Sequence, residues 1–189
     1  MVTQISSLSS VTARAAGAGR PRRATALRYV LNVVATDVAE VVSGIGGWLF
    51  DCRMAGWNVG VALTDSGDDR ALRILGLKAV DAERVWKTGD AEQVALTVIS
   101  ADRFAADDAT RDGGRHAPGA VAVWGADCPP ELAARFRLSH YRPSAAAQAF
   151  KVHSLTAAGV TGFRAGLPEN IFREVSGDWP LDADLTPVG

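Results

Sequence analysis

The first strongly patterned stretch of the chain has apolar residues that recur every three or four positions. They are Leu27, Val30, Leu31, Val34, Val38, Val41, Val42 and Ile45. This spacing places them on one stripe of a helix, so the sequence predicts an amphipathic helix over 27–45. Glycines at 44, 46 and 47 interrupt the pattern. Residues 48–55 are predicted to form a second short helix or a continuation of the first, closed by Gly56.

From Trp57 onward, short apolar runs alternate with helical stretches. Strands are predicted over 59–63, 77–80, 94–99, 120–124 and 137–141. Helices are predicted over 70–75, 82–87, 101–110, 129–136 and 145–158, and 111–118 is predicted to be an exposed loop. Such alternation with short connections indicates a parallel sheet covered by helices on both faces. The predicted fold class is α/β: a three-layer, Rossmann-like or flavodoxin-like domain with a mainly parallel sheet of four or five strands, after an N-terminal amphipathic helix.

The composition along the chain suggests three parts. Residues 1–25 are rich in Ser, Thr, Ala and Arg and cannot bury enough apolar surface to offset their ordering entropy, so they are predicted to be a disordered basic arm. Residues 26–160 are predicted to be the α/β domain. Residues 161–189 hold three prolines and five acids against two arginines, and they are predicted to be an irregular acidic segment that adds no strand.

The overall composition excludes several classes of protein. Of 189 residues, 48% are hydrophobic and 22% charged, which is too apolar for a wholly disordered chain. Two cysteines do not make a disulfide scaffold, and no apolar run is long enough to span a membrane. The absence of a secretory signal adds the expectation of a soluble, cytoplasmic protein, although an Arg- and Ser-rich start also suits an organelle transit peptide.

Charge is unevenly distributed along the chain. The first 36 residues hold five arginines and no acid, which leaves fifteen basic and 21 acidic residues in the remainder. The basic arm is therefore a functional element, a targeting segment or only a tail. An acidic remainder repels a polyanion, and the arm has no aromatic residues among its arginines. Nucleic acid is accordingly not an expected partner, whereas a protein partner or a second copy of the chain is.

One glycine-rich segment carries a candidate ligand site. The segment Val41-Val42-Ser43-Gly44-Ile45-Gly46-Gly47 resembles the Gly-rich turn of a Rossmann dinucleotide-binding unit, and Asp65 follows Gly44 by 21 residues at the end of the next predicted strand. The resemblance implies that Gly44, Gly46 and Gly47 approach the pyrophosphate of NAD(P) or another nucleotide, with Asp65 on the ribose. The alternative interpretation is that these small residues allow close packing of a helix.

A second set of candidates comes from polar residues at or near the ends of predicted strands, since these share one rim in a parallel sheet. The set comprises Asp65, Asp68, Ser100, Asp102, His140 and Arg142. A carboxylate beside a histidine can support acid–base chemistry, whereas acids such as Asp68 also serve as N-caps. Which of these residues would be catalytic is left unassigned.

The sequence lacks a complete catalytic or metal-binding signature. No two histidines have helical metal-ligand spacing, no cysteine lies near a histidine, and there is no nucleophile elbow or Walker loop. No metal and no cofactor are therefore expected. The sequence favours a non-catalytic binding or accessory protein that recognises a small ligand or a protein at the sheet rim. The alternatives are a nucleotide- or dinucleotide-dependent enzyme using Gly44–Gly47 and Asp65, and a structural dimer formed through the helix predicted at 27–45.

Overall fold

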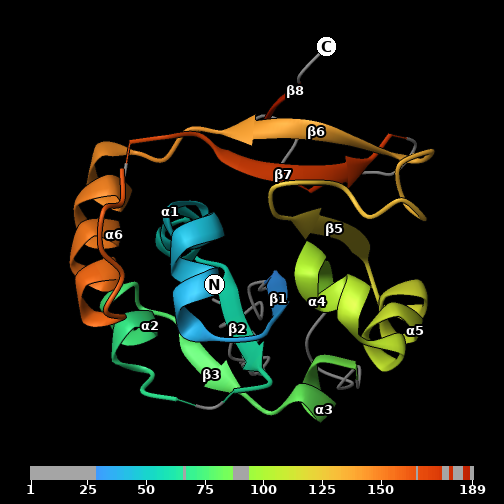
Figure 1. The fold of residues 1–189 in the computed structure, drawn as a ribbon, viewed down its shortest axis with the longest axis horizontal. Helices are drawn as coiled ribbons and strands as arrows, with labels where there is room; N and C mark the ends of the chain where they lie inside the picture. Colours follow the sequence, from blue (N-terminus) through green and yellow to red (C-terminus); the bar gives the residue numbers. More distant parts are fainter. Residues whose placement is uncertain are drawn as a thin grey trace, which may run out of the picture.

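The computed structural model describes residues 29–65, 67–86, 94–164, 166–175, 179–180 and 185–187, which build one sheet flanked by helices (Figure 1). The strands are β1 (Val30–Ala35), β2 (Asn58–Leu63), β3 (Lys78–Val80), β4 (Val94–Ser100), β5 (Ala120–Trp124), β6 (Phe136–Tyr141), β7 (Glu169–Glu174) and β8 (Leu185–Pro187). The helices are α1 (Val38–Met54), α2 (Arg70–Ile74), α3 (Ala82–Trp86), α4 (Ala101–Ala106), α5 (Asp108–His116) and α6 (Ala145–Ala157).

The sheet is mixed and mostly parallel. Its strand order is β3-β2-β1-β4-β5-β7-β6-β8. The first five strands in this order are parallel neighbours, whereas β7 is antiparallel to both β5 and β6, and β8 is antiparallel to β6. The prediction of an α/β fold with a mainly parallel sheet is confirmed. The predicted four or five strands are too few, and the sheet does not follow the flavodoxin-like alternative, in which the strand order is 2-1-3-4-5.

The helices lie on two sides of the sheet and complete three layers. One large apolar core joins α1, α2 and α6 to one face, through residues that include Trp48, Leu72 and Leu155. A smaller core joins α3 and α4 to the other face through Val85 and Phe104. From β1 the chain adds β2 and then β3 on one side of β1. It then crosses to the other side of β1 and adds β4 and β5, so the direction in which strands are added reverses between β1 and β4. In doubly wound sheets this reversal leaves a crevice for ligands at the carboxyl ends of the strands.

The predicted helix over 27–45 is wrong in its first half, because Val30–Ala35 form the central strand β1. All six residues of β1 are buried, since the strand has neighbours on both edges and helices over both faces. Such a strand is apolar throughout, and its valines also match a helical period. Val34 and Val38 are both buried inside the chain, so the valine-rich dimer face predicted from this helix does not exist.

Helix α1 runs without a break from Val38 to Met54 and contains all three glycines of the candidate nucleotide-binding turn. Three other glycines end helices as the sequence predicts. Gly56, Gly76 and Gly159 have φ values of 94°, 72° and 74°, a left-handed conformation that costs glycine little. The predicted strand–helix alternation between 58 and 110 is confirmed by β2, α2, β3, α3, β4 and α4.

The structure corrects three further predictions. Residues 111–116 belong to α5, whose N-cap Asp107 accepts a hydrogen bond from the Thr110 N–H, so this segment is not a loop. Residues 131–135 form turns, not a helix. Residues 161–189 do add strands, because β7 lies inside the sheet between β5 and β6. The predicted disordered arm over 1–25 lies outside the described residues. No helix in the described part of the chain is long and apolar enough to cross a membrane.

Candidate functional site

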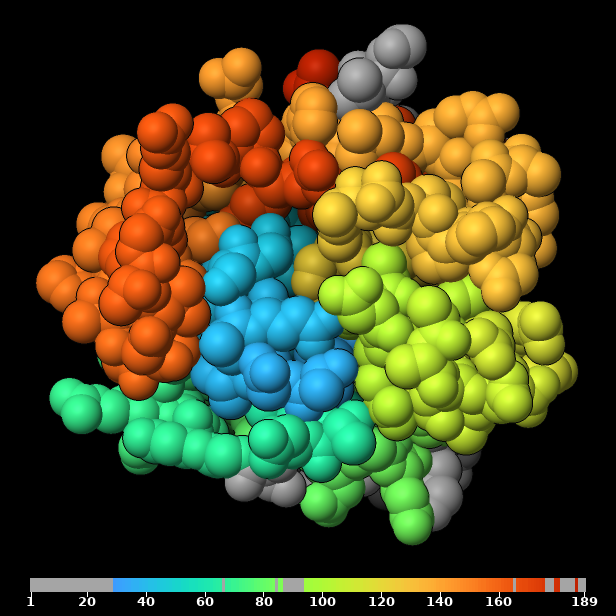
Figure 2. Space-filling view, viewed as in Figure 1, coloured from blue at the N-terminus to red at the C-terminus, as the bar shows by residue number. Residues whose placement is uncertain are grey.

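A cleft of about 380 Å³ opens beside the carboxyl ends of β4 and β5 and the first turns of α1. This is where the chain reverses direction between β1 and β4. In Figure 2 the blue atoms of the first turns of α1 lie beside the yellow-green atoms of α4 on this side of the molecule. The polar residues that line the cleft are Glu40, Ser43, Ser100, Asp102, Glu169 and Asn170.

Glu40 is held firmly at the N-terminal end of α1. The side chain of Asp37 caps the helix by accepting a hydrogen bond from the Glu40 N–H at 2.8 Å. In turn, Oε2 of Glu40 accepts from the Thr36 N–H at 2.8 Å, and Oε1 accepts from the hydroxyl of Ser100. The positive end of the helix dipole favours a negative charge at this position. The Glu40 carboxylate is therefore fixed from two sides while it faces the cleft.

Ser100 connects the carboxylate to the opposite wall of the cleft. It is the last residue of β4 and is 1% exposed. Its Oγ also accepts a hydrogen bond from the Arg103 N–H at 3.2 Å, which caps α4. Because this hydroxyl is buried and already engaged, it acts as a support for Glu40 and is poorly placed to attack a substrate.

Asp102 and Asn170 add free polar groups to the cleft. Asp102 is exposed in the first turn of α4 and has no hydrogen-bond or ion-pair partner among the described residues. Asn170 is partly exposed on β7, next to the buried Glu169. The cleft thus offers one fixed carboxylate, one unpaired carboxylate and one carboxamide, which can donate hydrogen bonds as well as accept them.

A buried ion pair forms the wall behind the cleft. The side chains of Lys151 and Glu169 are 6% and 2% exposed, and their Nζ and Oε1 atoms lie 2.5 Å apart. Glu169 also accepts hydrogen bonds from the N–H groups of Gly47 and Trp48 at 2.8 and 2.7 Å, while Lys151 donates to the Ser43 carbonyl at 2.8 Å. Burial raises the pKa of the Glu169 carboxyl, and Lys151 and the two N–H groups oppose that rise. The pair ties α1, α6 and β7 together.

The predicted nucleotide-binding turn is wrong because its glycines lie within α1. Gly44 does line the cleft, and a Cβ placed on it would lie 2.6 Å from Trp124 Cδ1. Gly47 does donate its N–H to an anion, but that anion is the chain's own Glu169. A Cβ on Gly46 would meet Leu75 at 3.3 Å. These glycines therefore serve close packing of α1 against its neighbours, the alternative that the sequence left open.

The remaining predicted residues do not line this cleft. Asp65 is exposed after β2, and its N–H donates to the Thr36 carbonyl. Asp68 is exposed and accepts a hydrogen bond from the Arg70 N–H. His140 lies on β6 opposite Asn170 of β7, with its Nδ1 buried and unpaired within the described part of the chain.

Arg142 is exposed just after β6. Because β7 separates β6 from β5, neither His140 nor Arg142 is among the residues that line the cleft. Of the nine predicted site residues, the structure brings Gly44, Ser100 and Asp102 together there.

Sequence reasoning missed the residue that is best placed in the cleft. Asp37-Val38-Ala39-Glu40 has the spacing of a capping box, in which an acid at the N-cap is followed three residues later by Glu. This signal marks a helix start at 37. The helical spacing of the preceding valines hides it, and a helix that begins there places Glu40 in the first turn after a strand.

Comparisons with known proteins detect similarity only at the level of structure. No family model and no curated protein sequence matches the chain. Among solved structures, a deacetylase triple mutant involved in the teicoplanin biosynthetic pathway superposes with a TM-score of 0.59 at 14% identity, covering 79% of this chain and 99% of that one. The pseudoaglycone deacetylase of another antimicrobial compound superposes with a TM-score of 0.56 at 13% identity, covering 80% and 99%.

A third structure, the zinc-inhibited form of teicoplanin deacetylase, has a TM-score of 0.54 at 12% identity and covers 78% of this chain and 100% of that one. At these identities the likeness establishes a shared fold. All three neighbours are enzymes, and this finding contradicts the sequence-based prediction of a non-catalytic binding or accessory protein. The alternative of a nucleotide-dependent enzyme is likewise unsupported.

The side chains in this cleft do not fit a zinc ion. No group of three or more His, Cys, Asp or Glu side chains in the described residues is arranged to hold a metal. The carboxylates of Glu40 and Glu169 are already engaged by donors from the protein, and no histidine lines the cleft. Zinc usually takes three or four ligands of these types, and Asp102 alone cannot supply them.

Proposed function

We propose that this chain is a hydrolase that removes an acyl group, such as acetyl, from an amine of its substrate. The observation that carries the proposal is the Glu40 carboxylate, held by Ser100 and the Thr36 N–H at a cleft beside the point where the chain reverses direction. Ligands of doubly wound, Rossmann-like sheets bind at this position. The shared fold with deacetylases supports the same reaction type.

In the proposed reaction, Glu40 is the general base. It takes a proton from a water molecule, whose oxygen attacks the carbonyl carbon of the bound amide. The side-chain amide of Asn170 donates a hydrogen bond to the oxygen that becomes negatively charged. The tetrahedral intermediate then breaks its C–N bond, and the departing nitrogen takes the proton from Glu40. The products are a carboxylic acid and an amine, and proton exchange with water then gives the carboxylate and the ammonium ion.

Each supporting residue has a defined part in this proposal. Ser100 and the Thr36 N–H orient the carboxylate, and Asp102 meets the amine that forms. The reaction consumes only water, so we infer that no nucleotide cofactor takes part.

The proposal is tested by incubating the full chain with a panel of N-acetylated amines that includes teicoplanin and N-acetylated amino sugars. Release of free amine and of acetate is measured in parallel. We expect at least one substrate to be hydrolysed. Glu40→Gln should lower kcat by about 100-fold or more, because a positioned general base typically contributes 10²–10⁴.

A matched control separates the role of Glu40 from a general effect of charge. Asp112→Asn removes an exposed carboxylate on α5, outside the cleft, and should leave the rate unchanged. The proposal fails if no N-acetylated amine is hydrolysed, or if Glu40→Gln is as active as the wild-type chain while both remain folded by circular dichroism.

A further inference from the structure

Acidic side chains dominate the charge on the cleft that contains Glu40. Glu40, Asp102 and Glu169 contribute carboxylates to the lining, and no Lys, Arg or His is among the described residues that line it. Lys151 neutralises Glu169 from behind the wall, with 2.5 Å between its Nζ and Oε1 of the acid. The carboxylates of Glu40 and Asp102 therefore face the cleft without a cation.

The charges around the cleft do not cancel these two carboxylates. Arg103 follows Asp102 on α4, but its Nη2 lies 3.0 Å from Oδ2 of Asp107, at the other end of that helix. The amino ends of α1 and α4 each carry a partial positive charge of roughly half a unit. The Asp37 carboxylate at the N-cap of α1 balances them. The cleft is therefore an electrostatically negative site.

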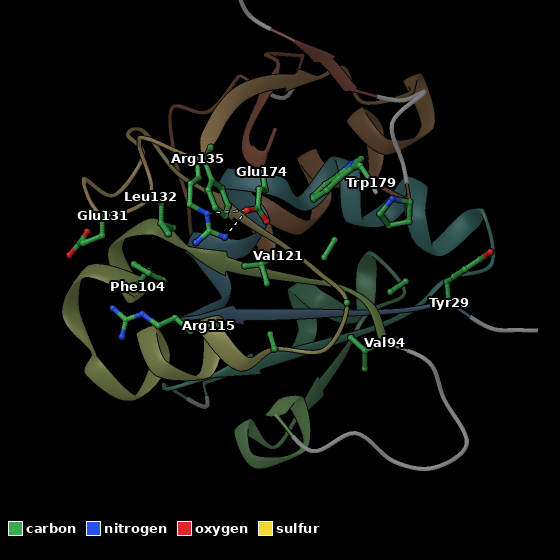
Figure 3. A pocket seen from close by; sticks show the side chains of 17 residues that line it. Tyr29, Val94, Phe104, Arg115, Val121, Glu131, Leu132, Arg135, Glu174 and Trp179 are labelled. Atoms are coloured by element: carbon green, nitrogen blue, oxygen red, sulfur yellow. Dashed lines mark hydrogen bonds and ion pairs between the residues drawn. The ribbon is translucent and has the colours of Figure 1, made fainter. Parts of the chain in front are cut away.

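A larger cavity in the described structure lacks this imbalance. It is a trough of about 890 Å³ at the amino ends of β4 and β5, and its charged lining residues are Arg115, Arg135, Glu131 and Glu174 (Figure 3). Arg135 donates to Glu174 Oε1 through Nη2 and Nε at 2.6 and 3.0 Å, as the dashed lines in Figure 3 mark. Because its positive and negative side chains are equal in number, the trough does not select a cation over an anion.

The cleft also contains a hydrogen-bond donor that has no partner within the described part of the chain. Trp124, the last residue of β5, is 2% exposed and lines the cleft. Its Nε1–H can only donate, and it donates to none of the described residues. This nitrogen is not among the fully buried polar atoms without a partner, so solvent reaches it from the cleft. A ligand with a carbonyl oxygen would satisfy this donor.

We propose that the substrate is an N-acylated diamine, in which the second amine is protonated. This inference rests on the proposed hydrolase function and names its substrate class. The acyl carbonyl accepts a hydrogen bond from the Trp124 N–H as well as from Asn170, and the ammonium group binds Asp102. A short molecule of this kind fits the volume of about 380 Å³, which is near the lower end of the range for small-ligand sites.

The charge of the cleft also accounts for the product and for excluded substrates. Hydrolysis of an N-acylated diamine leaves a product with two ammonium groups, and the carboxylates of Glu40 and Asp102 match them in number and sign. N-acyl amino acids carry a carboxylate in place of the second amine. The two carboxylates of the cleft repel that group, so these molecules are poor substrates.

Three acetamides of equal length test the sign of the site. They are N-acetyl-1,4-diaminobutane, N-pentylacetamide and 5-acetamidopentanoate, which are cationic, neutral and anionic at pH 7. For the wild-type chain we expect kcat/KM to be highest for the cation and lowest for the anion. Asp102→Asn should lower kcat/KM for the cation roughly fivefold and affect the neutral acetamide less, because a partly solvated ion pair is lost. Asp102→Lys should favour the anion.

The matched control is Asp112→Asn, which removes an exposed carboxylate on α5, outside the cleft. It should leave the order of the three acetamides and the size of their differences unchanged. A wild-type chain that hydrolyses the anion as well as the cation would overturn the substrate class while leaving the hydrolase function in place. Equal kcat/KM values for the cation in Asp102→Asn and Asp112→Asn would also overturn the substrate class.

Binding without turnover separates this inference from the hydrolase function. N-acetyl-1,4-diaminobutane is titrated into ¹⁵N-labelled Glu40→Gln, and the indole N–H resonance of Trp124 is identified by its absence in Trp124→Phe. We expect a saturable shift of this resonance and an affinity roughly fivefold weaker when Asp102→Asn is added. Such binding without any hydrolysis by the wild-type chain would overturn the hydrolase function alone. A Trp124 resonance that does not move would overturn the substrate class.

Discussion

Replacing Lys151 with methionine should destabilise the folded chain by about 3–5 kcal/mol, because it leaves the Glu169 carboxylate buried without its cation. Both side chains are almost fully buried, and the two charged atoms lie 2.5 Å apart. Methionine retains most of the apolar stem of lysine, so the loss reflects the charge and not a cavity. The N–H groups of Gly47 and Trp48 still solvate the carboxylate, which keeps the expected loss within this range.

Urea denaturation at pH 7 and thermal melting measure this loss. For a chain of this size each kcal/mol corresponds to roughly 2–4 °C in Tm, so a decrease of about 6–20 °C is expected. The matched control is Arg73→Met, which breaks an ion pair with Asp69 whose side chains are 67% and 45% exposed. Exposed pairs of this kind contribute about 0–1 kcal/mol.

The pH dependence provides a second signature of the same variant. Lys151 lowers the pKa of Glu169 against the upward effect of burial, so its removal raises the folded-state pKa further above the unfolded value. A proton then binds the folded state more tightly, and stability falls as pH rises through the folded-state pKa. The deficit of Lys151→Met should therefore be smaller at pH 5 than at pH 8. Equal losses in Lys151→Met and Arg73→Met, or a deficit that grows at low pH, would refute the reasoning.

Two further predictions concern packing and capping. Gly47→Ala should lower Tm, since its Cβ would lie 2.7 Å from Pro143, whereas Gly46→Ala, with 3.3 Å of clearance, should be tolerated better. Thermal melts of the two variants, side by side, check this, and a Gly47→Ala variant at least as stable as Gly46→Ala would contradict it. Ser100→Ala should lower the free energy of unfolding by about 1 kcal/mol through loss of the α4 cap, which urea titration measures. It should also reduce the initial rate of amine release, because Glu40 loses a support.

The middle of the fold could be predicted from the sequence because local patterns agree there with the final structure. Strands β2, β4 and β5 are apolar runs bounded by turn or capping residues. Gly56, Gly76 and Gly159 end helices at positions whose backbone has the left-handed conformation that glycine adopts most readily. The parallel arrangement followed from strand–helix alternation. These features depend on neighbours in the sequence and not on distant contacts.

The strands near the two ends of the chain, β1 and β7, could not be predicted from the sequence because they depend on distant contacts. Val30–Ala35 form a strand because they are enclosed by β2 and β4, an environment that their helical spacing does not reveal. In β7, the charged residue Glu169 is buried because Lys151 and two helix N–H groups satisfy it. A sequence that reads Glu-Asn-Ile-Phe-Arg-Glu gives no indication of that partner, so the sequence alone predicts an irregular segment there.

Only part of the candidate site could be predicted, because distant contacts place the other residues. Placing polar residues at the carboxyl ends of parallel strands correctly brought Ser100 and Asp102 to one cleft with Gly44. Inserting β7 between β5 and β6 moved His140 and Arg142 away, which strand-by-strand reasoning could not anticipate. Glu40 was available from its capping-box spacing, but only once the helix was allowed to begin at 38.

Hydrolysis in water labelled with ¹⁸O tests the proposed role of Glu40 most directly. The full chain and Glu40→Gln are compared on one N-acetylated amine, and mass spectrometry follows the labelled acetate that each releases. The account predicts one ¹⁸O atom from water in each acetate and a rate at least about 100-fold lower for Glu40→Gln. Equal rates for the two chains, or acetate formed without the label, would contradict it.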